Sequence, residues 1–236
     1  MPVSAAYTLE DHVARESDRY AQAKYEITRR WLAEYARPGM TLINAGCGSG
    51  YFNKVAAAMG LSVIACEPDP EAFELARAAA PASCTVYNCD LAVLEERGAR
   101  ADFVVIHDVL EHIADDARAV DLLHSVVNPG GHAIVSVPAM PALFGRHDEQ
   151  LGHFRRYTAK SLSRLLANRF DVCRLRYFGA LSIPIVLLFS KILRRDYPRN
   201  RGGNGFIDRV YGAICDFEVT AIFPIGTSLL ADVEPR

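Results

Sequence analysis

The sequence predicts a doubly wound α/β fold, in which helices cover both faces of a parallel sheet. Two observations carry this prediction. Short apolar runs alternate with helical patterns through the middle of the chain, and the first of these runs leads directly into a glycine-rich turn at 46–50. The composition agrees with one folded domain, because half of the 236 residues are hydrophobic and 23% are charged.

The expected elements follow one another in a regular order. A helical pattern over 8–37 predicts one or two leading helices, which Pro38-Gly39 ends. Apolar runs of strand length then occur at 41–45, 62–66, 85–88, 103–107 and 133–137. Helical patterns separate them at 53–59, 70–79 and 115–127, and Asn128-Pro129-Gly130-Gly131 predicts the end of the last helix. Parallel units of this kind place the carboxyl ends of their strands at one edge, where such sheets bind ligands.

The rhythm changes after the fifth run. The polar segment 138–157 has no periodicity, so we expect a long loop at the ligand-binding edge. A helix at 158–168 and strands at 172–178 and 227–233 complete the expected elements.

Charge, cysteines and hydropathy argue against several classes of protein. The chain has 26 Lys and Arg against 28 Asp and Glu, so nucleic acid is not an expected partner. The six cysteines form no C-x-x-C pair, which favours a reducing, cytoplasmic location over a zinc cluster or a disulfide framework. No secretory signal is expected at residues 1–10, and the apolar stretch 180–193 is shorter than the roughly 20 residues that cross a bilayer.

The glycine turn Gly46-Cys47-Gly48-Ser49-Gly50 lets a ligand approach the backbone closely. No lysine follows at the spacing of a phosphate-binding loop, which disfavours nucleotide hydrolysis. A dinucleotide site needs a small residue at position 51, where Tyr51 stands, so an NAD-dependent oxidoreductase is also disfavoured. A cofactor without phosphates fits this turn better.

Acidic residues follow the next two expected strands. Glu67 comes about 20 residues after Gly46, where a carboxylate can accept hydrogen bonds from both hydroxyls of a ribose. Asp90 follows the third strand, where an adenine amino group can donate to it. The two acids and the glycine turn together predict a row of contacts to a nucleoside.

These features resemble the class I S-adenosylmethionine-dependent methyltransferases, through 44–50, Glu67, Asp90, 107–113 and 128–138. The resemblance implies a Rossmann-like sheet of seven strands with an antiparallel last strand, and S-adenosylmethionine as cofactor. It implies that these residues bind the cofactor: Asn44, Gly46, Gly48, Gly50, Glu67, Pro68, Asp90, Leu91 and His107. Asn44 departs from the family, which usually has Asp there, and so loses charge assistance in its hydrogen bonds.

The run 107–112 contains two pairs at helical i,i+4 spacing, His107 with Glu111 and Asp108 with His112, which on a helix could chelate a divalent ion. We favour no metal, because the run resembles metal-independent members of the family and a helix-capping Asp108 accounts for it. Cys47 is interpreted as a small buried residue, not as a nucleophile.

The segment 145–157 concentrates histidines, acids and arginines on the side of the expected acceptor. Its string Leu-Gly-His-Phe-Arg-Arg-Tyr-Thr resembles a subgroup of bacterial methyltransferases, some of them ubiquinone-type O-methyltransferases and others linked to glycan or natural-product assembly. His153 is the first candidate for a general base or acceptor anchor, and His147 and Asp148 come next. We expect Arg155 and Arg156, together with Tyr157, to tie the loop to the following helix.

The predicted function is methyl transfer from S-adenosylmethionine to a small-molecule acceptor, favoured at oxygen. The alternatives are an N-methyltransferase and a non-catalytic regulatory protein that binds S-adenosylmethionine, for which Asn44 is the hint. The predicted single domain divides into a helical cap at 1–38, a cofactor-binding core at 39–178, a variable apolar and basic insertion at 179–226 and a last strand at 227–236.

Two further segments carry open alternatives. In the helical cap, Tyr7, His12 and Tyr20 either reach the cofactor or serve in packing. In the insertion, the apolar and then basic stretch 180–201 is either a peripheral membrane contact, a lid over a greasy acceptor, a buried helix or a dimer contact.

Overall fold

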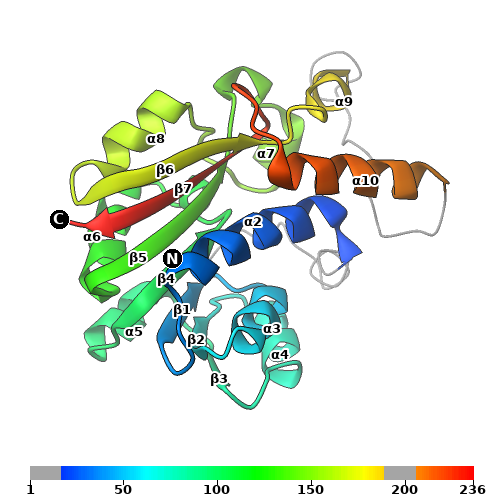
Figure 1. Ribbon diagram of the computed structural model, residues 1–236. Helices are drawn as coiled ribbons and strands as arrows, with labels where there is room; N and C mark the ends of the chain where they lie inside the picture. Colours follow the sequence, from blue (N-terminus) through cyan, green and yellow to red (C-terminus); the bar gives the residue numbers. More distant parts are fainter. Residues whose placement is uncertain (1–16, 189–205) are drawn as a thin grey trace.

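The computed structural model describes residues 17–188 and 206–236 (Figure 1). Within these residues one sheet has the strand order β3-β2-β1-β4-β5-β7-β6. Its strands are β1 (Thr41–Ala45), β2 (Ser62–Cys66), β3 (Cys84–Tyr87), β4 (Ala101–His107), β5 (Val127–Pro138), β6 (Phe170–Phe178) and β7 (Ser228–Pro235). The first five pair in parallel, and β7 is antiparallel to both of its neighbours, β5 and β6. The seven-stranded sheet with an antiparallel last strand is confirmed.

Helices cover both faces of the sheet, as Figure 1 shows. On one face, α2 (Arg19–Tyr35), α3 (Tyr51–Ala58) and α10 (Phe206–Thr220) contribute Ile27, Phe52 and Cys215 to a buried cluster. On the other face, α5 (Leu91–Glu96), α6 (Asp116–Val126) and α8 (Ala159–Leu166) contribute Leu94, Leu123 and Leu162 to a second one. The remaining elements are α4 (Pro70–Ala78), α7 (Arg146–Gln150), α9 (Ile183–Leu187) and the 3-10 turns η1 (Leu110–His112) and η2 (Pro141–Leu143).

The stretch 128–131 ends the helix as predicted, but it belongs to β5, which starts earlier than the predicted strand at 133–137. Helix α6 ends before it, as expected, but β5 begins at once with Val127, which pairs with Ala101. The next pair joins His132 to Phe103, so the four residues between are accommodated as a register shift inside the strand. The turn-forming residues therefore end the helix and then bulge from the sheet.

The segment 138–157 also differs from the long loop expected of it, because it contains η2 and α7. The first turn of α7 is stabilised by Asp148, whose Oδ2 accepts a hydrogen bond from the backbone N–H of Gly145 at 3.0 Å. This helix fixes the positions of His147 and Asp148, which a flexible loop would leave variable.

Parts of the cap and the insertion lie outside the described residues. Tyr7 and His12 are among them, as is the whole basic part of the 180–201 stretch. In and beside α9, Ile183 and Val186 are buried whereas Leu181, Ile185 and Leu188 are exposed, so one face of this part of the stretch packs against the domain and the other is open. Among the described helices, none has the length and apolar character needed to cross a membrane.

Candidate active site

The glycine turn connects β1 to α3 at the carboxyl edge of the sheet. Gly46, Gly48 and Gly50 all have positive φ, at 68°, 56° and 85°. A Cβ on Gly46 would lie 2.6 Å from Val109 Cγ2, and one on Gly50 would lie 3.1 Å from Ala76 Cα. A Cβ on Gly48 would have no described atom within 4 Å beyond its chain neighbours. Gly46 and Gly50 thus serve close packing, whereas Gly48 faces open space that can take a ligand.

Glu67 lies directly beside that open space. The backbone N–H of Gly48 donates to its Oε2 at 2.8 Å, and the N–H of Asp69 donates to its Oε1 at 3.0 Å. Pro68 continues the same turn, which Asn88 holds by donating from Nδ2 to the Glu67 carbonyl at 2.8 Å. Because each carboxylate oxygen can accept a second hydrogen bond, Glu67 keeps acceptor capacity next to the Gly48 backbone.

Asp90 and Leu91 stand one strand further out, at the start of α5. Asp90 is the N-cap residue of this helix and accepts from the backbone N–H of Val93 at 3.2 Å. Since β2 and β3 are adjacent and parallel, Glu67 and Asp90 follow neighbouring strands at the same edge. The structure therefore brings the predicted row together.

Asn44 lies just before the glycine turn and Cys47 lies within it, and the contacts of both are structural. Asn44 is buried in β1 and donates from Nδ2 to Asn53 Oδ1 of α3 at 2.8 Å, which ties the strand to the helix below the turn. Burial raises the pKa of the Cys47 thiol far above its usual value, which agrees with the interpretation of Cys47 as a packing residue.

Helix α2 closes over the edge beside His107. The ring nitrogen Nε2 of His107 lies 2.9 Å from Thr28 Oγ1, and the ring packs against Tyr25 and Phe52 at centroid distances of 4.9 and 5.0 Å. The hydroxyl of Tyr20, on the same helix, lies 2.6 Å from Oγ1 of Thr227, the residue just before β7. His107 is thus part of an aromatic wall, and Tyr20 is engaged in packing.

Asp108 has a different role from the helix cap that its sequence position suggests. It adopts a left-handed conformation, with φ of 54°, and forms a buried ion pair with Lys24 of α2. Its other oxygen accepts from Ser136 Oγ at 3.1 Å. The residues from 108 to 112 form a bend and a 3-10 turn, not an α-helix, so the proposed i,i+4 chelating pairs do not arise. No sequence signal marks Lys24 as the partner of Asp108.

Asp148 is a buried carboxylate on the acceptor side that accepts hydrogen bonds from several groups. Its side chain is 1% exposed, Arg156 Nε donates to its Oδ1 at 2.7 Å, and His153 Nδ1 lies 2.9 Å from the same oxygen. Burial alone would raise the pKa of Asp148, but the hydrogen bonds from His153 and Arg156 outweigh it and hold the pKa at about 2. Asp148 therefore orients the His153 ring and stays ionised.

Arg155 and Arg156 make structural contacts, but with other elements than the expected following helix. Arg156 also donates to the carbonyl of Ala139 at 3.2 Å, just after β5. Arg155 forms an ion pair with Asp116 at 2.7 Å, and the Tyr157 hydroxyl donates to the same carboxylate at 2.9 Å. These residues tie the segment to the start of α6 and the end of β5, instead of to the following helix α8, because the segment folds back over η1.

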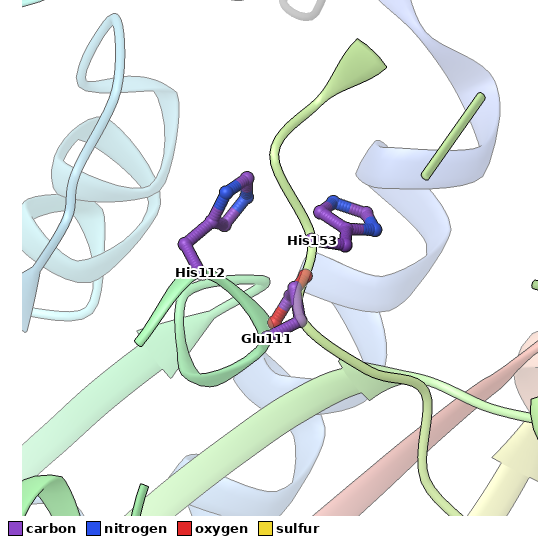
Figure 2. A group of neighbouring side chains, drawn as sticks. All are labelled: Glu111, His112 and His153. Atoms are coloured by element: carbon purple, nitrogen blue, oxygen red, sulfur yellow. The ribbon is translucent and has the colours of Figure 1, made fainter. Parts of the chain in front are cut away.

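His153 meets two side chains that are distant in sequence. Figure 2 shows Glu111 and His112 on the turn after β4 and His153 on the segment that follows α7. The rings of His112 and His153 lie 4.6 Å apart in an edge-on arrangement, and ligand atoms of all three side chains lie within 4.8 Å of one another. His147, on the half-buried first turn of α7, does not belong to this group. The sequence offers no spacing signal for a cluster that spans about 40 residues.

Comparisons of the sequence with known proteins identify a family and several relatives. Residues 16–169 match the family described as "Methyltransferase domain". A probable S-adenosylmethionine-dependent methyltransferase of Mycolicibacterium smegmatis is 30% identical over 63% of this chain and 58% of its own length. A ubiquinone biosynthesis O-methyltransferase of Methylocella silvestris is 31% identical over 55% of this chain and 50% of its own. The chain thus spans only about half the length of such curated relatives.

Solved structures share the fold. Phosphoethanolamine N-methyltransferase 2 of Haemonchus contortus, in complex with S-adenosylmethionine, has a TM-score of 0.66 at 13% identity and covers 99% of this chain and 59% of that one. Magnesium protoporphyrin IX methyltransferase of Synechocystis has a TM-score of 0.60 at 18% identity and covers 92% and 84%. At these identities the likeness concerns the fold alone.

Proposed function

The chain belongs to the Methyltransferase domain family of S-adenosylmethionine-dependent enzymes, and we propose that it methylates a small-molecule acceptor at oxygen. The observation that carries the proposal is the open face of Gly48 beside the Glu67 carboxylate, in a turn whose glycines all have positive φ. A side chain at Gly48 would fill this space, and an adenosyl group without phosphates fits it.

The cofactor would be held by groups along the strand edge. Glu67 would accept hydrogen bonds from the ribose hydroxyls, and Asp90 with Leu91, after the next strand, would contact the adenine. The turn from Gly46 to Gly50 would contact the methionine part, while Asn44 keeps the turn in place through Asn53. His107, which packs against Tyr25 and Phe52, would close the opposite side.

His153 is the residue that acts on the acceptor. When bound, S-adenosylmethionine supplies an electrophilic methyl group, and its transfer leaves the bonding electron pair on sulfur. An acceptor hydroxyl must lose its proton to become a competent nucleophile, whereas a neutral amine needs no base for its attack. Asp148 holds Nδ1 of His153, so Nε2 can take that proton, and the ionised Asp148 stabilises the charged ring. This pair favours an oxygen acceptor.

The experiment uses the full chain with methyl-labelled S-adenosylmethionine and fractionated small metabolites, with products identified by mass spectrometry. We expect a labelled methyl ether or ester, lost in Glu67→Ala and retained in Glu74→Gln, an exposed position on α4. Label on nitrogen would overturn the oxygen assignment. Binding of S-adenosylmethionine without any product would instead support the regulatory alternative, and absence of binding would refute the proposal.

A further inference from the structure

One carboxylate and two imidazoles converge beside the glycine turn. Glu111 and His112 belong to η1, and His153 belongs to the segment after α7 (Figure 2). Their ligand atoms lie within 4.8 Å of one another, a separation that one ion can bridge after small side-chain adjustments. We propose that Glu111, His112 and His153 bind one divalent transition-metal ion of the zinc class.

The hydrogen bond between His153 and Asp148 supports this proposal independently of the cluster itself. Histidines that bind metals generally donate their other ring nitrogen to a carboxylate, which fixes the tautomer and the ring orientation. His153 Nδ1 lies 2.9 Å from Asp148 Oδ1, and Arg156 Nε donates to the same oxygen at 2.7 Å. Nδ1 is thereby occupied, and Nε2 is the nitrogen that would bind the ion.

The backbones that carry the three ligands are joined directly. The N–H of Phe154 donates to the carbonyl of Glu111 at 2.7 Å, and Arg155 Nη2 donates to the carbonyl of Ala114 at 2.5 Å. These bonds, made by the two residues that follow His153, hold the segment after α7 against η1 and the residues just after it. The ligands therefore stand on a rigid support, which metal sites need to keep their geometry.

The donor set selects the class of ion. Two imidazoles and one carboxylate suit Zn²⁺, Co²⁺ or Fe²⁺, whereas Mg²⁺ and Ca²⁺ prefer oxygen ligands throughout. Structural zinc sites use four protein ligands, while sites with three leave a coordination position for water or substrate. The trio thus corresponds to a site with an open position.

The place of the cluster suggests what fills that position. Val109, two residues before Glu111 in the chain, packs against Gly46 of the cofactor turn. An ion at the trio would lie on the acceptor side of the turn, where it would bind the acceptor oxygen and lower the pKa of its hydroxyl. This role rests on the proposed methyl transfer to oxygen. With the ion bound, His153 Nε2 would coordinate it and could not act as the base described above, so the acidified hydroxyl would release its proton to solvent.

Metal binding is measured on tag-free protein that has been stripped with chelator. Titration with Zn²⁺ gives stoichiometry and affinity, and Co²⁺ reports nitrogen and oxygen ligands through its visible absorption. We expect one ion per chain.

Three variants test the assigned ligands. His112→Gln and His153→Gln should each weaken metal binding more than Asp148→Asn, for which a loss of affinity of about 10–100-fold is expected. His124→Gln is the matched control, because the His124 ring in α6 packs on Phe170 of β6, away from the trio, and this variant should bind like the unaltered protein.

The outcomes separate this inference from the proposed function. His112 is half-buried, whereas the His153 side chain is 8% exposed, so circular dichroism checks that both variants fold, and His112→Gln carries the test if His153→Gln does not. The metal site is overturned if the unaltered protein does not bind one ion per chain, or if His112→Gln and His153→Gln bind the ion as tightly as the unaltered protein does. Either outcome counts even if methyl transfer is observed. Stoichiometric binding lost in both variants supports the site even if no methyl transfer is found. If transfer occurs and chelation leaves it unchanged, the ion has no role in acceptor binding.

Discussion

The cofactor side and the acceptor side of the strand edge are built by different means. On the cofactor side, backbone groups fix the structure. The N–H groups of Gly46 and Cys47 both donate to the Cys66 carbonyl, and the glycines allow close packing. On the acceptor side, buried charges join distant segments, as in the pair between Asp148 and Arg156. The first side should therefore be sensitive to added atoms, and the second to removed charges.

Arg156→Ala breaks the acceptor side and should have the largest effect on stability. It leaves Asp148 charged, buried and without its main partner, which should lower the free energy of unfolding by about 3–5 kcal/mol. Arg169→Ala is the control, because its pair with Asp121 is half exposed and contributes less than about 1 kcal/mol. Urea denaturation measures both, and equal losses would contradict the contrast.

Gly46→Ala breaks the cofactor side through an added atom. Its Cβ would collide with Val109 at a position with φ of 68°, so the free energy of unfolding should fall by about 2–4 kcal/mol from strain and overpacking. Gly48→Ala should cost only the strain, about 1–2 kcal/mol, because its Cβ enters open space.

The ligand response should reverse this order. The added methyl of Gly48→Ala occupies the space assigned to the cofactor, so S-adenosylmethionine affinity per folded molecule should fall even though the fold is largely kept. Calorimetric titration alongside thermal unfolding measures both quantities. Full affinity in Gly48→Ala would show that the open face does not receive the ligand.

Acid should weaken the acceptor side through Asp148. Its folded-state pKa of about 2 lies below the value of about 3.9 expected in the unfolded chain, so its stabilisation is complete above about pH 4 and is lost as pH falls through 2. The contribution is roughly 2 kcal/mol. Asp148→Asn should therefore reduce stability at neutral pH and flatten the acid limb. An unchanged acid limb in this variant would assign the effect to other carboxyls.

The smallest expected effect distinguishes a helix cap from a ligand contact. Asp90→Ala and Asp115→Ala each remove an N-cap hydrogen bond, of 3.2 and 3.0 Å, and each should cost about 1 kcal/mol. Only Asp90→Ala should weaken binding of S-adenosylmethionine, because Asp115 caps α6 away from the nucleoside row. Equal affinities in calorimetric titration would leave Asp90 with a capping role alone.

The strands and the helices α3 and α4 of the cofactor side could be predicted from the sequence to within about two residues, whereas the short helix α5 after Asp90 was not predicted. The strand β1, the positive φ of its three glycines and the position of Glu67 after β2 all follow from local patterns. Such patterns are readable because backbone conformation and strand alternation depend on residues close in the chain. Another exception is 128–131, where turn-forming residues are absorbed into β5.

The acceptor side could be predicted in composition but not in its connections. His153 and Asp148 stand out as functional residue types, yet their links to Arg156 and their approach to Glu111 and His112 have no sequence signal. The ion pair of Lys24 with Asp108 is hidden for the same reason, since its partners are 84 residues apart. Charged side chains can pair with many others, and only the packed fold selects one.

The sequence by itself determined the alternation of strands and helices, the glycine turn and the two acids that follow the neighbouring strands. These features depend on hydrophobic periodicity and backbone freedom, which act locally. Only the tertiary structure decided that β7 lies between β5 and β6, that α2 closes over His107, and that one carboxylate and two imidazoles meet. These depend on which distant surfaces bury each other, and that choice is made by the whole chain at once.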